Sequence, residues 1–268
     1  MRRSVYPVAS VAIAFLVAVP ASAQSVDEIV AKNLKAKGGA DVLRQTNSVK
    51  MTGTFKAFQP TETTMAMTTW AKRPNFLRQE AEGTPPPRQD ALGMPAGPQK
   101  PVRMIRASDG TTMWMQQGSA PAQTLPAGQS QTPQDTEFDS VFIDYQAKGV
   151  VINNLGVEKV AGRDVYHLAV KRKTGPLQHY YLDTETGLEA KVSTDVSQGG
   201  AITQSGPTMK IETEMSDYRA VEGRMVPFKL RQSVDRQVQA EITIETVEFN
   251  GEMPDALFKV PMTSGVPR

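Results

Sequence analysis

Histidine is the side chain best suited to acid–base chemistry near neutral pH, and this chain has only two, His167 and His179. Neither has a second histidine at metal-ligand spacing, and the chain has no cysteine. There is also no Gly-x-Ser-x-Gly motif and no glycine-rich phosphate loop. Asp139 and Asp144 fit solvated helix positions better than a catalytic pair. A Ser-His-Asp triad stays open. The residues nevertheless favour a protein that is not an enzyme and that needs no metal or cofactor; an enzyme would lose activity when either histidine is changed.

The chemistry of Arg73 depends on where its side chain lies. Strand alternation over 63–72 continues to Arg73, so one face carries Met65, Met67, Thr69, Ala71 and Arg73. This face is mainly apolar, so we expect it to point inward. A buried guanidinium is costly unless acceptors match its N–H groups. We therefore expect Arg73 to bind backbone carbonyls of a covering element; the alternative is a solvated arginine at a strand end.

Methionine side chains form a second candidate set. Methionine is unbranched and polarizable, so it adapts to irregular apolar partners such as acyl chains; the alternative is ordinary core filling. Leu77 shares its face with Met67 and Arg73 when the intervening turn is allowed for. The candidate lining residues are Met65, Met67, Leu77, Met104, Met113 and Met115, and Phe138 and Phe142 are expected to supply the apolar face of a lid.

The elements that would position these residues are mainly strands. Ser25 and Glu28 have the spacing of a capping box, and Gly38-Gly39 ends the helix that they begin. A helical turn is expected at 41–44. Aromatic and aliphatic residues at i, i+3, i+4 and i+7 predict a short amphipathic helix over 138–145. Period-2 alternation and turn signals predict about eleven strands, drawn from twelve candidate segments: 49–55, 63–72, 76–82, 102–107, 111–116, 151–160, 164–171, 178–183, 188–194, 209–221, 224–234 and 239–249.

Two segments, 84–101 and 119–133, are rich in proline and lack periodicity, so we expect them to be mobile surface loops.

Many sequential antiparallel strands with a few short helices favour one strongly curved sheet. Helices with a single apolar stripe must bury that stripe. The predicted fold is therefore mainly β with short helices: an open antiparallel half-barrel with a helical lid over an apolar cavity.

The N-terminus has the pattern of a secretory signal peptide. Arg2 and Arg3 precede an apolar run over 8–19, which is far shorter than the roughly 20 residues that span a bilayer, and small residues at 21–23 form a cleavage site. A retained anchor helix is the alternative. Cleavage after Ala23 predicts a periplasmic domain over 24–268 without a lipidated cysteine. Loss of two of the 30 basic residues would leave 28 against 28 acidic residues, and this balance disfavours a nucleic-acid partner.

Two motifs carry a family resemblance. Residues 70–78 read WAKRPNFLR, and residues 108–114 read SDGTTMW. Both resemble, residue for residue and at comparable spacing, motifs of the LolA family of periplasmic lipoprotein carriers. The resemblance is specific over about 46–116 and looser over 150–260, and the proline-rich segments look like insertions. It adds Trp114 to the candidate site and implies that Arg73 holds a lid shut.

The resemblance implies a carrier that binds the acyl chains of lipoproteins or lipids and moves them toward the outer membrane. An inner-membrane transporter as donor and an outer-membrane acceptor are the implied partners, and a monomer is expected. Two alternatives stay open. A related fold serves in envelope-stress sensors that bind a membrane regulator. A divergent member could instead carry a glycolipid or another hydrophobic ligand.

Overall fold

The computed structural model describes residues 24–59, 61–84, 88–89, 95–96, 100–125, 138–197 and 208–261. The predicted signal peptide lies outside these residues, as do parts of both proline-rich segments. None of the helices within the described ranges combines the length and the hydropathy needed to cross a membrane.

The N-terminal helices begin and end where the sequence indicates. In α1 (Val26–Ala36) the Ser25 hydroxyl accepts from the Glu28 amide and the Glu28 side chain reaches back, so the capping box is confirmed. The second helix, α2 (Ala40–Arg44), follows a two-glycine turn. Gly38 has φ +115°, and a Cβ there would lie 2.3 Å from the Gly223 carbonyl oxygen. Glycine thus allows the two backbones to approach closely, and a 3.3 Å hydrogen bond from Met225 N to Lys37 O joins the helical region to the sheet.

The sheet within the described ranges contains thirteen strands, in the order β8-β7-β6-β3-β2-β1-β15-β14-β13-β12-β11-β10-β9. All strand pairs are antiparallel, and the sheet is open because β8 and β9 remain its edges. The strands are β1 (Ser48–Ala57), β2 (Thr63–Lys72), β3 (Phe76–Gly83), β6 (Val102–Ser108), β7 (Met113–Gln117), β8 (Gln123–Thr124), β9 (Val151–Val160), β10 (Arg163–Lys171), β11 (Gln178–Asp183), β12 (Glu189–Ser197), β13 (Thr208–Val221), β14 (Arg224–Val234) and β15 (Gln237–Phe249). The predicted fold class is confirmed; β8 is the strand that alternation did not indicate.

Short strand pairs interrupt the proline-rich segments. Within 84–101, β4 (Arg88–Gln89) pairs with β5 (Pro95–Ala96), apart from the main sheet. Within 119–133, β8 pairs with β7. The predicted mobility of the two segments is not tested by these pairings.

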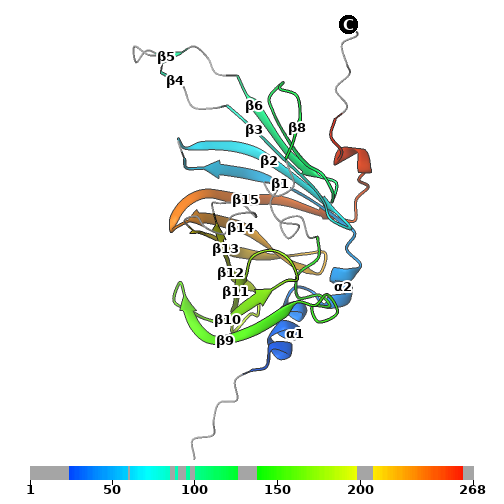
Figure 1. The fold of residues 1–268 in the computed structure, drawn as a ribbon, viewed down its shortest axis with the longest axis vertical. Coiled ribbons are helices and arrows are strands. Elements are labelled where there is room, and N and C mark those ends of the chain that lie inside the picture. The colour runs from blue at the N-terminus through cyan, green and yellow to red at the C-terminus, as the bar shows by residue number, and fades with distance from the viewer. Residues whose placement is uncertain are drawn as a thin grey trace, which may run out of the picture.

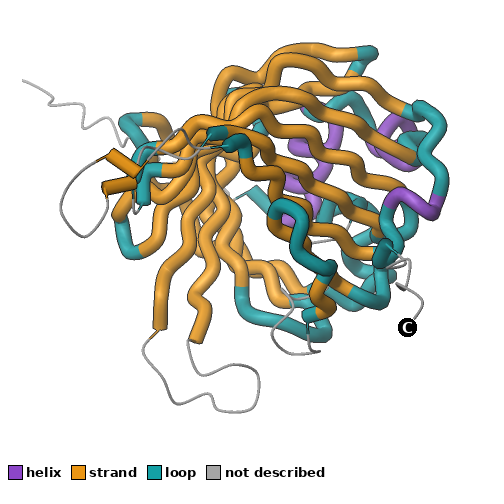
Figure 2. Tube along the Cα trace, turned by 90° about the horizontal axis from the view of Figure 1, so that it is seen from above, coloured by secondary structure: helices purple, strands orange, loops and turns teal. Residues whose placement is uncertain are grey.

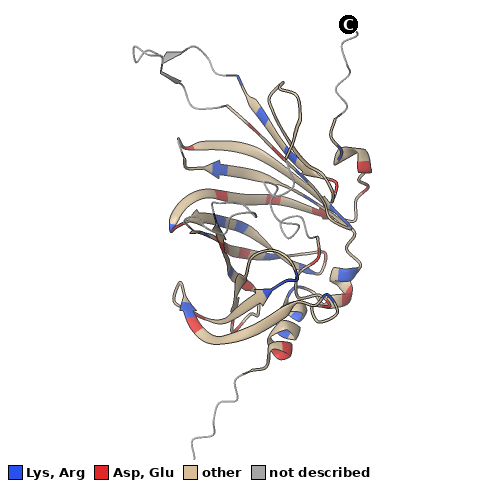
Figure 3. Ribbon diagram, viewed as in Figure 1, with Lys and Arg blue, Asp and Glu red and all other residues tan. Residues whose placement is uncertain are grey.

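The sheet curves strongly, with the helices at one end of its strands (Figures 1 and 2). We call the face toward α2 the inner face. Near β9–β11 this face is covered by α1 and by segment 138–150, and their apolar side chains form one buried cluster with Ile152, Leu168, Val170 and Leu182. Basic and acidic positions are interspersed over the helices and strands in Figure 3.

The predicted helix over 138–145 does not form, which corrects the sequence analysis. Residues 141–149 make consecutive turns instead. Asp144 has φ +51°, a left-handed conformation that interrupts a right-handed helix. Val141, Phe142 and Ile143 are all buried, so three successive side chains find apolar surroundings rather than one helical stripe. The spacing of apolar residues over 138–145 therefore reflects side chains that are buried on more than one side of the segment.

The outer face carries a C-terminal strap, residues 253–260, which includes the short 3-10 helix η2 (Asp255–Leu257). The Trp114 indole Nε1 donates to the Phe258 carbonyl over 2.8 Å. The Phe258 ring stacks on Phe76 with centroids 5.3 Å apart. Arg78 Nη1 donates to the Leu257 carbonyl over 2.8 Å. Trp114 therefore lies on the outer face, because strand alternation turns it to the opposite face from Met113 and Met115. This placement corrects its assignment as a lining residue.

We predict that Trp114→Phe destabilises the protein by about 1–3 kcal/mol, because the buried Phe258 carbonyl loses its donor. Urea unfolding followed by circular dichroism measures the change. Trp70→Phe is the matched control, since Trp70 lies on the same outer face and is only partly buried. Equal destabilisation by the two substitutions would show that the indole hydrogen bond does not hold the strap.

Candidate functional site

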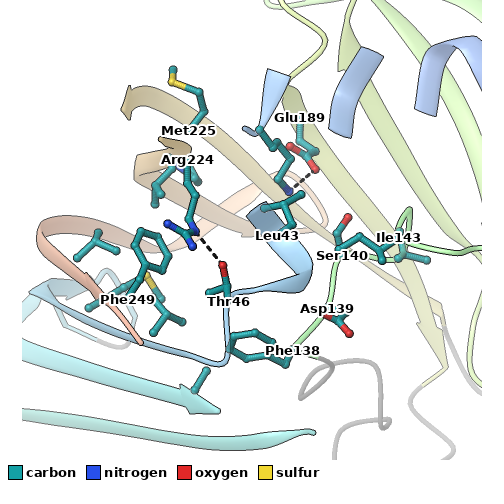
Figure 4. Close-up of a pocket in the computed structure, with 18 of the residues that line it drawn as sticks. Leu43, Thr46, Phe138, Asp139, Ser140, Ile143, Glu189, Arg224, Met225 and Phe249 are labelled. Atoms are coloured by element: carbon teal, nitrogen blue, oxygen red, sulfur yellow. Dashed lines mark hydrogen bonds and ion pairs between the residues drawn. The ribbon is translucent and has the colours of Figure 1, made fainter. Parts of the chain in front are cut away.

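An apolar cavity of about 440 Å³ lies between α2, segment 138–143 and the inner face. We call it the lid-end cavity. The strand register brings its floor together, because Val49 pairs with Ala71 and Phe249, and Ala71 pairs with Leu77. Leu43 of α2 and Phe138 face this floor from the other side (Figure 4). The floor is therefore built from inner-face strand ends, and α2 and segment 138–143 form the opposite wall.

Arg73 follows β2 at the rim of this cavity. Its Nε donates to the Thr46 carbonyl over 2.8 Å, and its Nη2 donates to the carbonyls of Leu43 and Arg44 over 3.2 and 3.1 Å. These acceptors belong to the C-terminal turn of α2 and the residues after it, where helix carbonyls lack intrahelical partners. The partly buried guanidinium thus has the carbonyl partners that its N–H donors require.

Arg73 also holds segment 138–143. Its Nη1 lies 2.6 Å from one oxygen of Asp139, and its Nη2 lies 2.6 Å from the other. This is the two-pronged geometry of a strong arginine–carboxylate pair. The Arg73 guanidinium carbon lies 5.3 Å from the centroid of the Phe138 ring. One side chain therefore connects the strand rim to both elements that cover the cavity.

A second arginine, Arg224, binds α2 from the sheet, and the sequence analysis missed it. Its Nε donates to the Thr46 hydroxyl over 2.8 Å, and its Nη2 donates to the Val42 carbonyl over 3.4 Å. Its guanidinium lies 4.5 Å from the centroid of the Phe249 ring, and Figure 4 shows it pointing at Thr46. Arg224 begins β14 directly after a Glu-Gly turn, so only tertiary structure places it here.

An exposed ion pair joins α2 to the turn segment. Arg44 Nη2 lies 2.7 Å from Asp144 Oδ1. The hydrogen bond from Arg44 lowers the pKa of Asp144, and the same contact raises the pKa of Arg44. Because both side chains are about half exposed, solvent screening leaves this pair weaker than the Arg73–Asp139 pair.

A buried ion pair forms the polar end of the lid-end cavity. Lys37 Nζ lies 2.8 Å from Glu189 Oε1, and the Glu189 side chain is only 7% exposed. Burial acts to raise the pKa of Glu189, but attraction to Lys37 and its hydrogen bond outweigh burial and hold that pKa below 4.5. Tyr218 donates its hydroxyl to the Glu189 carbonyl over 2.9 Å. Burial, together with the charge of Glu189, raises the pKa of Tyr218.

The structure divides the predicted lining residues among several places. Leu77 and Phe138 line the lid-end cavity. Met65 and Met113 are buried in the sheet, and Phe142 packs in the cluster beneath α1. Met67, Met104 and Met115, with Leu77 again, line a second cavity of about 690 Å³. The candidate residues therefore do not form one site, and Phe142 contributes to the core rather than to a cavity wall.

The two histidines meet on neighbouring strands. His167 Nε2 and His179 Nδ1 are 2.7 Å apart, and His167 stacks on Tyr181. They lie on the face opposite to Leu168, away from both cavities. Over the described ranges, no group of three or more histidine, cysteine, aspartate or glutamate side chains is arranged to hold a metal ion.

Comparison with protein-family models and with curated protein sequences gave no match. Solved structures do match. A LolA superfamily protein from Nitrosomonas europaea has a TM-score of 0.55 at 12% identity, over 88% of this chain and 98% of its own. The chain has a LolA-like fold. A Vibrio parahaemolyticus domain that bears the name of an outer membrane lipoprotein-sorting protein gives a TM-score of 0.53 at 12% identity, over 87% and 95% of the chains.

A DUF1329 family protein from Desulfovibrio piger shares the LolA-like fold with a TM-score of 0.55 at 12% identity, over 87% of this chain and 97% of its own. At this identity the comparison establishes the arrangement of the strands and helices. The roles of individual residues within the LolA-like fold must be argued from their contacts in this chain.

We predict that Glu189→Gln flattens the loss of stability in acid. The folded pKa of Glu189 lies below its ordinary value, so its contribution is present above that value and is lost as pH falls below about 4.5. Unfolding free energies measured by urea titration from pH 6 downward give the slope.

The control is Glu62→Gln, because the Glu62 side chain is 61% exposed in its pair with Lys56. This substitution should leave the acid slope close to that of the native chain. An unchanged slope in Glu189→Gln would mean that the Lys37–Glu189 pair does not contribute to the acid response.

Proposed function

We propose that this protein is an exported carrier that binds the acyl chains of lipoproteins, or of lipids, in its hollow and passes them toward the outer membrane. The observation that carries the proposal is the contact set of Arg73, which fastens two covering elements over an apolar cavity. The likeness in fold to a domain named for lipoprotein sorting supports it. So does the secretory pattern of the first 23 residues.

The proposed mechanism is an exchange of apolar partners. In the empty protein, Leu43, Phe138 and Val141 face the apolar strand ends. An entering acyl chain displaces these side chains and takes their place against the sheet. Each CH₂ group moved out of water contributes about 0.8 kcal/mol, so one fatty chain supplies on the order of 10 kcal/mol before opening is subtracted.

Opening costs the hydrogen bonds of Arg73. A hydrogen bond to a charged group contributes about 1.5–3 kcal/mol net. When the lid moves, water can reach the guanidinium and the freed carbonyls, so these groups do not stay unsatisfied. We call these contacts of Arg73 the Arg73 clip. Breaking the clip lowers the net affinity for cargo but leaves the cavity accessible. A modest net affinity suits a carrier that must hand its cargo on.

The donor and the acceptor are part of the proposal. A lipoprotein carrier receives cargo from an inner-membrane transporter and delivers it to an outer-membrane acceptor. The balanced charge of the chain argues against broad electrostatic attraction to anionic membranes. Specific docking to proteins at both membranes is the transfer route that this charge balance favours.

We predict that Arg73→Leu leaves the fold intact and increases retention of a triacylated lipopeptide by about tenfold or more. Loss of the clip destabilises the closed empty state, and 1.4 kcal/mol corresponds to a factor of ten. Release to acceptor vesicles measures retention, and circular dichroism checks the fold.

Arg231→Leu is the control, because Arg231 pairs with Glu241 at a side-chain exposure of 53%. It should release cargo at the native rate. Native release by Arg73→Leu would remove the clip role of Arg73, and failure of the native chain to bind lipopeptide would remove the carrier function.

A further inference from the structure

The hollow contains two cavities in succession along the strands. The lid-end cavity is lined by residues near the helix end of the strands, such as Val49, Ala71 and Val247. The second cavity is lined by residues farther along the same strands, including Phe55, Met67 and Ile242. We call it the open-end cavity. Leu77 lines both and marks the boundary between them.

The covering elements reach only one of the two cavities. The lid-end cavity has walls from Leu43, Thr46 and 138–143. None of the described residues that line the open-end cavity belongs to α1, α2 or segment 138–150. The contacts of Arg73 likewise lie wholly at the lid end. A ligand in the open-end cavity therefore does not have to break the Arg73 clip.

The open-end cavity extends across many strands of the curved sheet. Its lining includes Gln232 of β14 and Met115 of β7, which are separated by six inter-strand steps. At roughly 4.8 Å per step, this is about 29 Å along the curved surface. This reach and a volume of about 690 Å³ provide room for one extended acyl chain.

The lining chemistry also fits an unbranched chain. Met67, Met104 and Met115 provide adaptable apolar contacts. Met104 and Met115 are 37% and 44% exposed, and exposed apolar side chains that line a groove indicate a surface a ligand covers. Polar and charged side chains also line this cavity and offer hydrogen bonds to a polar head group: Gln79, Glu80, Arg106, Gln116, Gln117, Gln123 and Gln232.

We propose that the open-end cavity holds one unbranched acyl chain while the Arg73 clip stays closed. This inference rests on the proposed carrier function and divides its site into two parts. A single-chain amphiphile occupies the open-end cavity alone. A cargo with several chains fills this cavity first and opens the lid only for the chains that remain.

The test measures palmitate affinity by isothermal titration calorimetry on the full chain and its variants. Met104→Gln and Met115→Gln keep unbranched side chains of similar length but make the lining polar. Each should weaken palmitate binding by about tenfold. Arg73→Gln should leave palmitate affinity within about twofold of native while changing release of a triacylated lipopeptide.

Leu155→Gln is the matched control, since Leu155 is 55% exposed but lies outside both cavities. It should bind palmitate as the native chain does. The inference is overturned if Arg73→Gln changes palmitate affinity and neither methionine variant does. It is also overturned if the native chain binds lipopeptide but not palmitate. The carrier function survives either result. If neither ligand binds the native chain, both proposals fail.

Discussion

The guanidinium of Arg73 needs acceptors at the end of an apolar strand face, and much of the site follows from that need. Its partners are the last carbonyls of α2, the residue after them, and the carboxylate of Asp139. Helix ends present free carbonyls and carboxylates present paired oxygens, so few other elements could have satisfied a fork of five donors. This requirement acts together with Arg224 and the Lys37–Glu189 pair to set where the covering elements meet the sheet.

The same strand alternation gives one short motif two tasks. Arg73 turns inward to the covering elements, while Lys72 and Arg78 turn outward to the C-terminal strap. Phe76 stacks on Phe258 from the same outer face. The motif therefore binds α2 on the inner face and the C-terminal strap on the outer face. In the proposed mechanism, the lid opens on the inner face while the strap stays bound to the outer face.

Local rules predicted most of the strands, the capping box of α1 and the carbonyl partners of Arg73. Each depends on alternation, on turn chemistry or on the donors of a single side chain. Arg224 and the Lys37–Glu189 pair were not predictable, because they join segments more than 150 residues apart. The sequence over 141–149 resembled a helix because apolar residues buried on two sides of the segment have a spacing close to the helical period. Trp114 was assigned to the wrong face because its motif does not reveal which face of the sheet is the inner one.

The central claim is that the hollow carries acyl chains. Native mass spectrometry of the chain purified from its own periplasm, followed by lipid extraction, tests this claim most directly. The account predicts a bound fraction with the added mass of lipoprotein or lipid, and acyl chains in the extract. A bare protein that also fails to take up a lipidated peptide would contradict it and would turn attention to a protein partner.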